Sequence, residues 1–197
     1  MGLIRKIDNL LDKSEVGDIL KSAENKIFSK AYSLSDYNNR NNPNHIIEKS
    51  SRKGQVIFLE ESDVPHFKKI QKAFESFMQD EIYVDVDHYE IQLAKYEEGD
   101  FFKLHTDSLL DYATAKKGKC RKLSMSVQLS DPNDYDGGEL EVYIPNQTKN
   151  KSFKIETLSN EQGAGIIFPS FLDHSVSKLK TGTRLALVVW ANGNFWR

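Results

Sequence analysis

The chain has 197 residues, 39% hydrophobic, 28% charged and 11% aromatic, which is enough apolar matter for one ordinary domain and argues against extensive disorder. A net charge of -2 and a pI near 6.2 provide no general attraction for nucleic acid or an anionic membrane. The lone cysteine, Cys120, excludes an internal disulfide framework. Residues 1–20 lack a signal-peptide core, and no segment approaches the roughly 20 apolar residues of a membrane span. We therefore expect a cytoplasmic protein with no membrane partner.

The first eighty residues carry helical patterns. Apolar residues recur near a 3.6-residue period over residues 3–28, which predicts one or two amphipathic helices. Residues 33–44, rich in Asn, Ser and Asp, are typical of a loop. A further helix is predicted over residues 64–78, behind Ser62 and Asp63 as candidate caps.

Beyond residue 82 the period changes to the two-residue alternation of β-strands, and turn residues such as Gly137 and Gly138 separate the runs. The predicted strands are residues 83–86, 89–96, 123–129, 139–144, 153–158, 165–168 and 184–190. Helices followed by many short strands favour a helix-buttressed antiparallel sandwich or jelly roll over alternating βαβ units. We predict one α+β, mainly β domain over residues 1–197, in which helical support (residues 1–80) buttresses a double-stranded β-helix, or jelly roll (residues 82–193).

A candidate metal site begins with His105 and Asp107, which lie two positions apart. In an extended segment their side chains project to the same face and can supply two ligands of a 2-His-1-carboxylate triad. Taken alone, such a pair is more often solvated or structural. The pair therefore needs support from elsewhere in the chain.

That support comes from His174 and Arg184. His174 follows the short apolar strand 165–168 and is a candidate third ligand, although a lone histidine there is usually structural. Arg184, ten residues on, begins an apolar run, where an unpaired guanidinium is costly. A dicarboxylate would match its planar fork, while the alternative is an ion pair with an acidic side chain at the surface.

Four blocks in order resemble the 2-oxoglutarate and Fe(II)-dependent dioxygenase superfamily, in particular its prolyl-4-hydroxylase-like branch and the bacterial PKHD-type hydroxylases. They are YEEGDFFKLHTD, LSMSVQLSDPNDYDGGELEVY, GAGIIFPSFLDHSV and TGTRLALVVWANG. The resemblance covers roughly residues 82–193.

The resemblance implies Fe(II), 2-oxoglutarate and O2 as cofactors, with ascorbate as a further candidate. It assigns His105, Asp107 and His174 to the iron and Arg184 to the distal carboxylate of 2-oxoglutarate. Tyr96 would donate its hydroxyl to the cosubstrate, or it packs the core as strand tyrosines often do.

Ser126 is a further candidate for cosubstrate binding. It shares the polar face of strand 123–129 with Ser124 and Gln128, and this face lines the pocket or meets solvent.

The resemblance implies hydroxylation of a substrate with release of succinate and CO2. The leading substrate class is a peptidyl proline or other protein side chain, and a small metabolite is the next. Nucleic acid is less favoured, because the demethylating branch has a second arginine where this chain has Trp190. The rival from another class is a non-catalytic metal-binding jelly-roll module. The sequence sets no oligomeric state.

Overall fold

The computed structural model describes residues 2–31, 51–108, 118–145 and 153–194, so the loop predicted over residues 33–44 lies outside the described residues. None of the helices in these ranges is long and apolar enough to cross a bilayer. The α-helices are α1 (Lys13–Ala23) and α3 (Phe67–Asp80), and short 3-10 turns are η2 (Glu61–Asp63) and η3 (Pro132–Asp134). The strands are β1 (Arg5–Ile7), β2 (Ser29–Lys30), β3 (Arg52–Lys53), β4 (Gln55–Leu59), β5 (His88–Glu97), β6 (Phe101–His105), β7 (Lys119–Gln128), β8 (Tyr135–Gly137), β9 (Leu140–Pro145), β10 (Phe153–Thr157), β11 (Gly165–Pro169), β12 (Asp173–Val176) and β13 (Leu179–Asn194).

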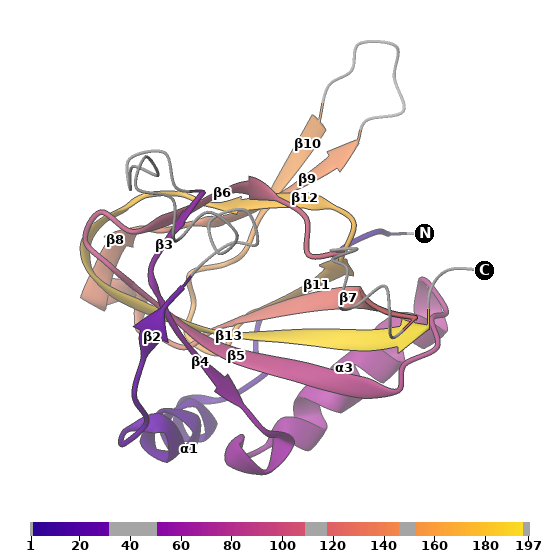
Figure 1. Ribbon diagram of the computed structural model, residues 1–197, viewed down its shortest axis with the longest axis horizontal. Helices are drawn as coiled ribbons and strands as arrows, with labels where there is room; N and C mark the ends of the chain where they lie inside the picture. The colour runs from indigo at the N-terminus through magenta and orange to yellow at the C-terminus, as the bar shows by residue number, and fades with distance from the viewer. Residues whose placement is uncertain (1, 32–50, 109–117, 146–152, 195–197) are drawn as a thin grey trace.

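The strands form two antiparallel sheets that face each other (Figure 1). The larger sheet has the order β1-β11-β7-β13-β5-β4-β2, with β8 paired to β13. The smaller sheet has the order β10-β9-β12-β6-β3. Neighbouring strands are mostly far apart in sequence, as in a jelly roll. The predicted mainly β, helix-buttressed jelly-roll class is confirmed.

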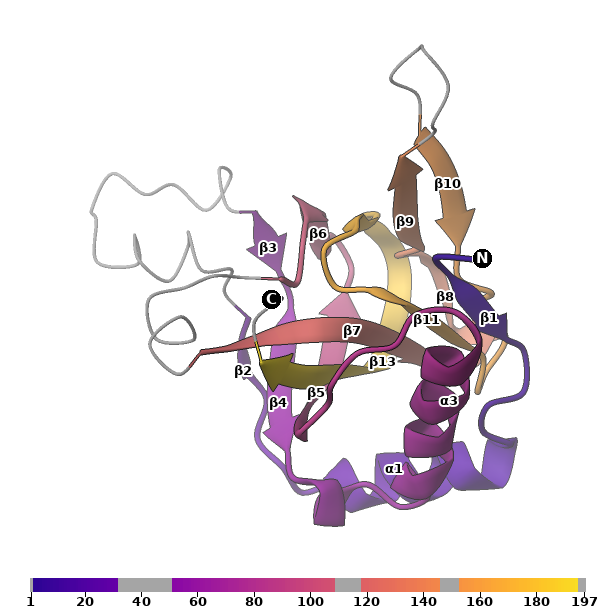
Figure 2. The same cartoon turned by 90° about the vertical axis from the view of Figure 1, so that its right-hand side faces the viewer.

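Helices α1 and α3 cover the outer face of the larger sheet (Figure 2). The apolar stripe of α3, with Ile70, Phe74 and Phe77 fully buried, packs on side chains such as Leu93 and Leu187 from the sheet. Burial of each large apolar side chain contributes about 1.5–3 kcal/mol. This layer is the main apolar core, and it holds the larger sheet in place.

The helix predicted over residues 3–28 is wrong at both ends. Residues Arg5–Ile7 form β1, which pairs with β11, and the helix proper is only Lys13–Ala23. Asp12 fixes its start, because its carboxylate accepts the backbone N–H of Glu15 while the Glu15 side chain accepts the N–H of Asp12. This capping box satisfies two backbone N–H groups that have no partner within the helix, so the helix begins at Lys13.

The helix predicted over residues 64–78 is confirmed as α3, but the predicted caps are wrong. Its N-cap is His66 in the left-handed conformation, and the Asp63 carboxylate instead accepts the N–H of Glu60 across the turn η2. The strand predicted over residues 83–86 is also wrong, since strand pairing begins at His88. The predicted Gly137-Gly138 turn is confirmed by a positive φ at both glycines.

A second buried layer lies between the two sheets and contains the pocket described below. Strands β1, β2 and β4 of the N-terminal eighty residues belong to the larger sheet, and β3 belongs to the smaller one. This segment was predicted as helical support, and it supplies strands as well as helices. We propose that the chain folds as one domain in which residues before 82 complete both sheets.

Candidate metal centre and anion pocket

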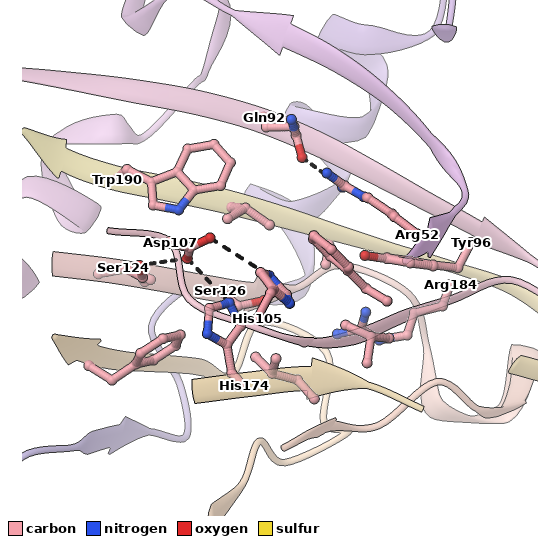
Figure 3. Close-up of a pocket in the computed structure, with 17 residues that line it drawn as sticks. Arg52, Gln92, Tyr96, His105, Asp107, Ser124, Ser126, His174, Arg184 and Trp190 are labelled. Carbon is pink, nitrogen blue, oxygen red and sulfur yellow. Dashed lines mark hydrogen bonds and ion pairs between the residues drawn. The ribbon is translucent and has the colours of Figure 1, made fainter. Parts of the chain in front are cut away.

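Side chains from both sheets converge on one pocket (Figure 3). Each strand contributes through its period-two alternation, which turns every second side chain toward the gap between the sheets. The residues that line the pocket are Arg52, Gln92, Tyr96, Phe102, His105, Asp107, Ser124, Met125, Ser126, Leu140, Phe168, His174, Val176, Arg184, Ala186, Val188 and Trp190.

The structure brings the three predicted metal ligands together. His105 ends β6, Asp107 follows two residues later, and His174 lies on β12 directly across from His105. The Asp107 carboxylate lies 3.8 Å from His105 Nε2 through Oδ1 and 3.3 Å from His174 Nε2 through Oδ2. Potential ligand atoms of all three lie within 4.8 Å of one another, so the cluster can hold one metal ion.

Backbone carbonyls set the orientation of both imidazoles. His105 Nδ1 lies 2.8 Å from the Lys103 carbonyl oxygen, and His174 Nδ1 lies 3.0 Å from that of Leu172. Because a carbonyl only accepts, each Nδ1 carries the proton, and in the neutral ring Nε2 keeps its lone pair. Both lone pairs therefore belong to the nitrogens nearest Asp107, which is the donor set that a divalent ion needs.

Burial and mutual charge set the protonation of the cluster. Burial, together with the charge of the neighbouring His174, lowers the pKa of His105 to about 3. Burial works against an ionised Asp107, but His174 outweighs it and holds the pKa of Asp107 below its usual range. Burial also works against the charged form of His174, yet the Asp107 carboxylate raises the pKa of this histidine. In the metal-free cluster these shifts favour an ionised Asp107 beside His174, and a metal ion would compete with a proton for Nε2 of His174.

Arg184 is a buried cation in the same pocket. Its side chain is 3% exposed, and no carboxylate of the described residues forms an ion pair with it. Tyr96 lies opposite it on β5, with the guanidinium carbon 5.8 Å from the centre of the ring. Tyr135 is also close: burial raises the pKa of its hydroxyl, and the Arg184 charge opposes this. A carboxylate would offset the cost of burying this guanidinium between two tyrosines, so the pocket fits a carboxylate ligand.

The other predicted pocket residues lie as follows. Tyr96 is 4% exposed and lines the pocket, and so does Ser126 on β7. The polar face of strand β7 therefore meets the pocket and not solvent. Gln128, further along this face, lines an adjoining cavity with Tyr135 and Arg184.

Several contacts in the pocket were not predicted. Ser124 donates a hydrogen bond of 2.7 Å to Asp107 Oδ2, a contact that the alternation on β7 could have suggested. Gln92 lies four residues before Tyr96 and therefore on the same strand face. It accepts a hydrogen bond from Arg52, which comes from the segment predicted to be helical.

Trp190 is a further residue of the pocket. It is buried, with the Arg121 guanidinium carbon 3.6 Å from its ring centre. Its indole N–H has no hydrogen-bond partner among the described residues. The pocket therefore presents an unused donor beside the His-Asp-His cluster (Figure 3).

Comparison with known families gives one match over half the chain. Residues 91–192 match the 2OG-Fe(II) oxygenase superfamily. This region contains all three candidate metal ligands and Arg184.

Curated relatives are PKHD-type hydroxylases. One, from Acidovorax ebreus, is 27% identical over 194 residues, which cover 95% of this chain and 77% of that protein. Another, from Prochlorococcus marinus, is 35% identical over 100 residues, 51% of this chain and 40% of that protein. The chain thus aligns with less than half of the second relative. The first alignment carries the similarity into the N-terminal eighty residues.

Solved structures share the fold. A prolyl hydroxylase from Trichoplax adhaerens, in complex with a peptide fragment of the hypoxia inducible factor oxygen degradation domain, superposes with a TM-score of 0.67 at 17% identity. The superposition covers 96% of this chain and 83% of that one.

Proposed function

The chain belongs to the 2OG-Fe(II) oxygenase superfamily, and from this premise we propose that it is an Fe(II)- and 2-oxoglutarate-dependent dioxygenase that hydroxylates a peptidyl proline or other protein side chain. The observation that carries the proposal is the pairing, in one pocket, of a His-Asp-His cluster with a buried arginine that has no acidic partner among the described residues. The His-Asp-His cluster fits a divalent metal, and the arginine fits the far carboxylate of a dicarboxylate cosubstrate.

His105, Asp107 and His174 would hold the iron through two Nε2 atoms and a carboxylate oxygen. Their donor set suits a ferrous ion, and it leaves three metal positions for other ligands. Iron and 2-oxoglutarate, when bound, supply the oxidising chemistry, in which O2 and 2-oxoglutarate are converted to succinate, CO2 and the hydroxyl group of the product. Ascorbate is a candidate further cofactor. The cytoplasmic setting predicted from the sequence is part of the proposal, since a reducing compartment suits ferrous iron.

Arg184 would bind the distal carboxylate of 2-oxoglutarate through its planar fork. Tyr96 lies across from it on β5, and Ser126 lines the same pocket from β7. We assign both hydroxyls to the cosubstrate as hydrogen-bond donors. Apolar side chains such as Leu140 and Val176 line the remaining wall and would limit the access of water.

The proposed substrate class rests on the unused donor at Trp190. Its indole N–H lies in the pocket wall and meets no acceptor from the part of the chain that the structure describes, and a backbone carbonyl of a bound peptide would satisfy it. The Trichoplax neighbour is a prolyl hydroxylase solved with a peptide, which agrees with this class. A small metabolite with a carbonyl group is the alternative substrate.

The proposal is tested by anaerobic titration of the Fe(II)-loaded protein with 2-oxoglutarate. A chelated Fe(II) cosubstrate complex has a weak visible charge-transfer band, which we expect in the wild type and not in His105→Ala. Absence of the band in folded, iron-loaded wild type would instead favour a non-catalytic metal-binding module. Peptides and metabolites can then be compared by the succinate that they release.

A further inference from the structure

The carboxylate of Asp107 is held by a serine relay inside the protein. Ser124 Oγ donates a hydrogen bond of 2.7 Å to Asp107 Oδ2. Ser124 is 1% exposed, and its cross-strand neighbours Phe168 and Trp190 lie on either side of it. With so little exposure, the hydroxyl is committed to protein partners.

Ser170 is the second member of the relay. Because each serine hydroxyl has one proton, the direction of its hydrogen bonds can be assigned. Its Oγ lies 2.9 Å from Ser124 Oγ. Because Ser124 has one hydroxyl proton and gives it to Asp107, Ser170 must be the donor to Ser124. The Ser170 carbonyl also accepts the backbone N–H groups of Asp107 and Ser108, each at 2.9 Å. One fully buried serine thus supports both the side chain and the main chain of Asp107.

The relay makes the two carboxylate oxygens unequal. Oδ2 receives the Ser124 proton and lies near His174, whereas Oδ1 lies 3.8 Å from His105 Nε2 and accepts no hydrogen bond from the described residues. We propose that the Ser170–Ser124 relay is a positioning device that fixes the Asp107 carboxylate, so that a metal binds through Oδ1 alone. The metal's identity as iron rests on the proposed function, but the relay is defined by the protein itself.

The consequence concerns the number of open metal positions. Two histidines and one carboxylate oxygen occupy three positions of a six-coordinate ion and leave three. If both oxygens were bound, one fewer would remain, and a two-point cosubstrate together with O2 would no longer fit. Hydrogen bonds to ligating carboxylates typically change metal affinity about 10- to 100-fold. The relay would therefore act on both the affinity and the coordination number.

The experiment uses Co(II) alone as the probe, added to the full-length metal-free protein without 2-oxoglutarate. Its dissociation constant and the intensity of its visible bands, which depends on coordination number, are measured for the wild type and four variants. Ser124→Ala removes the donor, Ser124→Thr keeps a hydroxyl, and Ser170→Ala removes the upstream donor. Ser130→Ala is the matched control, because this serine is also buried and hydrogen-bonded but bonds Thr183 and Leu185 instead of Asp107.

We expect Ser124→Ala to weaken Co(II) binding at least about 10-fold and to change the band intensity. Ser170→Ala should change the affinity and the band intensity in the same direction as Ser124→Ala, but by a smaller amount. It therefore tests the relay even if Ser124→Ala does not fold. Ser124→Thr should bind close to the wild type, and Ser130→Ala should bind like the wild type even if it is less stable.

Wild-type affinity and spectrum in Ser124→Ala would overturn the relay, as would an equal loss in Ser124→Thr. A loss in Ser130→Ala as large as that in Ser124→Ala would overturn it too, since the effect would then be general. If wild type binds Co(II) but the iron-loaded protein does not respond to 2-oxoglutarate, the proposed function fails and the relay is still tested. If the wild type binds no metal, both fail.

Discussion

On strand β7 of the larger sheet, the two faces carry different kinds of side chain. On β7, Leu123 and Val127 are fully buried against the layer that contains the helices, while Ser124 and Ser126 line the pocket. Adjacent residues on the strand therefore point to opposite faces, so that one side chain packs in the core and the next lines the site. The two faces can therefore be altered independently.

The two faces differ in how the burial of their side chains changes the free energy of folding. Burial of apolar side chains against the helices favours folding, at about 25 cal/mol per Å². The pocket face instead buries charges and hydroxyls, and such groups cost free energy unless they are paired. Arg184 is the extreme case, since it is almost fully buried and no acidic side chain in the described part of the chain pairs with it. We infer that the helix side stabilises the fold enough to offset the polar groups on the pocket side.

The largest effect on activity is expected for His174→Gln. The amide can still donate a hydrogen bond to Asp107, so the variant should fold, but it lacks the imidazole ligand. We expect turnover, measured as succinate formation, to fall at least about 100-fold, while the unfolding temperature of the metal-free protein stays close to that of wild type. Unchanged turnover would refute the assignment of His174 to the metal. A large loss of stability would refute the separation of the two faces.

The largest effect on stability is expected for Phe74→Ala on the helix side. Phe74 is fully buried, and its ring centre lies 5.5 Å from that of Tyr89. The cavity should lower the free energy of unfolding by about 3–5 kcal/mol, measured by urea denaturation. Phe58→Ala is the control, because Phe58 is 64% exposed and its loss should change stability by less than about 0.5 kcal/mol. If folded Phe74→Ala also binds metal more weakly, the faces are coupled.

These strands show what could be predicted from the sequence. Strands β5, β7 and β13 alternate apolar and polar residues over long runs, and their existence followed from that period. Strand β12 has only four residues, two of them polar at the surface side, and it is a strand because β6 and β9 pair with it. Strands β1 and β3 are similarly short and depend on partners more than 45 residues away. Tertiary pairing, which no local pattern records, decides such strands.

The residues of the site also divide into those that could be predicted from the sequence and those that depend on strand pairing. His105, Asp107, His174 and Arg184 could be predicted because their spacing follows a known pattern. Ser170 could not, since its relay to Asp107 exists only after β11 has paired with β7.

Substitution of Arg184 should affect ligand binding and stability in opposite directions. Arg184→Met should weaken 2-oxoglutarate binding about 10- to 100-fold, because charged hydrogen bonds worth about 1.5–3 kcal/mol are lost. The ligand-free protein should be as stable as wild type or more stable, since the substitution removes a buried cation that pairs with no acid in residues 2–31, 51–108, 118–145 and 153–194. Calorimetric titration and thermal unfolding give the two values. Arg184→Lys, which keeps the charge but not the fork, should lie between them in affinity. Wild-type affinity in Arg184→Met would end its role as the anchor.

The smallest effect is expected outside both layers, where an ion pair joins the edges of the two sheets. Lys6 on β1 lies 2.7 Å from Glu156 on β10, and hydrogen bonds from Lys154 and then Lys6 lower the pKa of Glu156 to about 2. Because its folded pKa lies below the ordinary value of 4.5, the carboxylate contributes stability above that pH and loses it as pH falls through about 2. Surface pairs of this kind contribute less than about 1 kcal/mol.

Glu156→Gln should therefore be slightly less stable than wild type in urea at neutral pH, and the difference should vanish near pH 2. Glu161→Gln, at an exposed glutamate on the same molecule, is the control, and its stability in urea at neutral pH should be close to that of wild type. A difference that persists near pH 2 would mean that Glu156 stabilises the sheet edges by packing and not by charge. A difference as large as that of Phe74→Ala would mean that contact between the sheet edges, and not the helix layer, dominates the stability of the larger sheet.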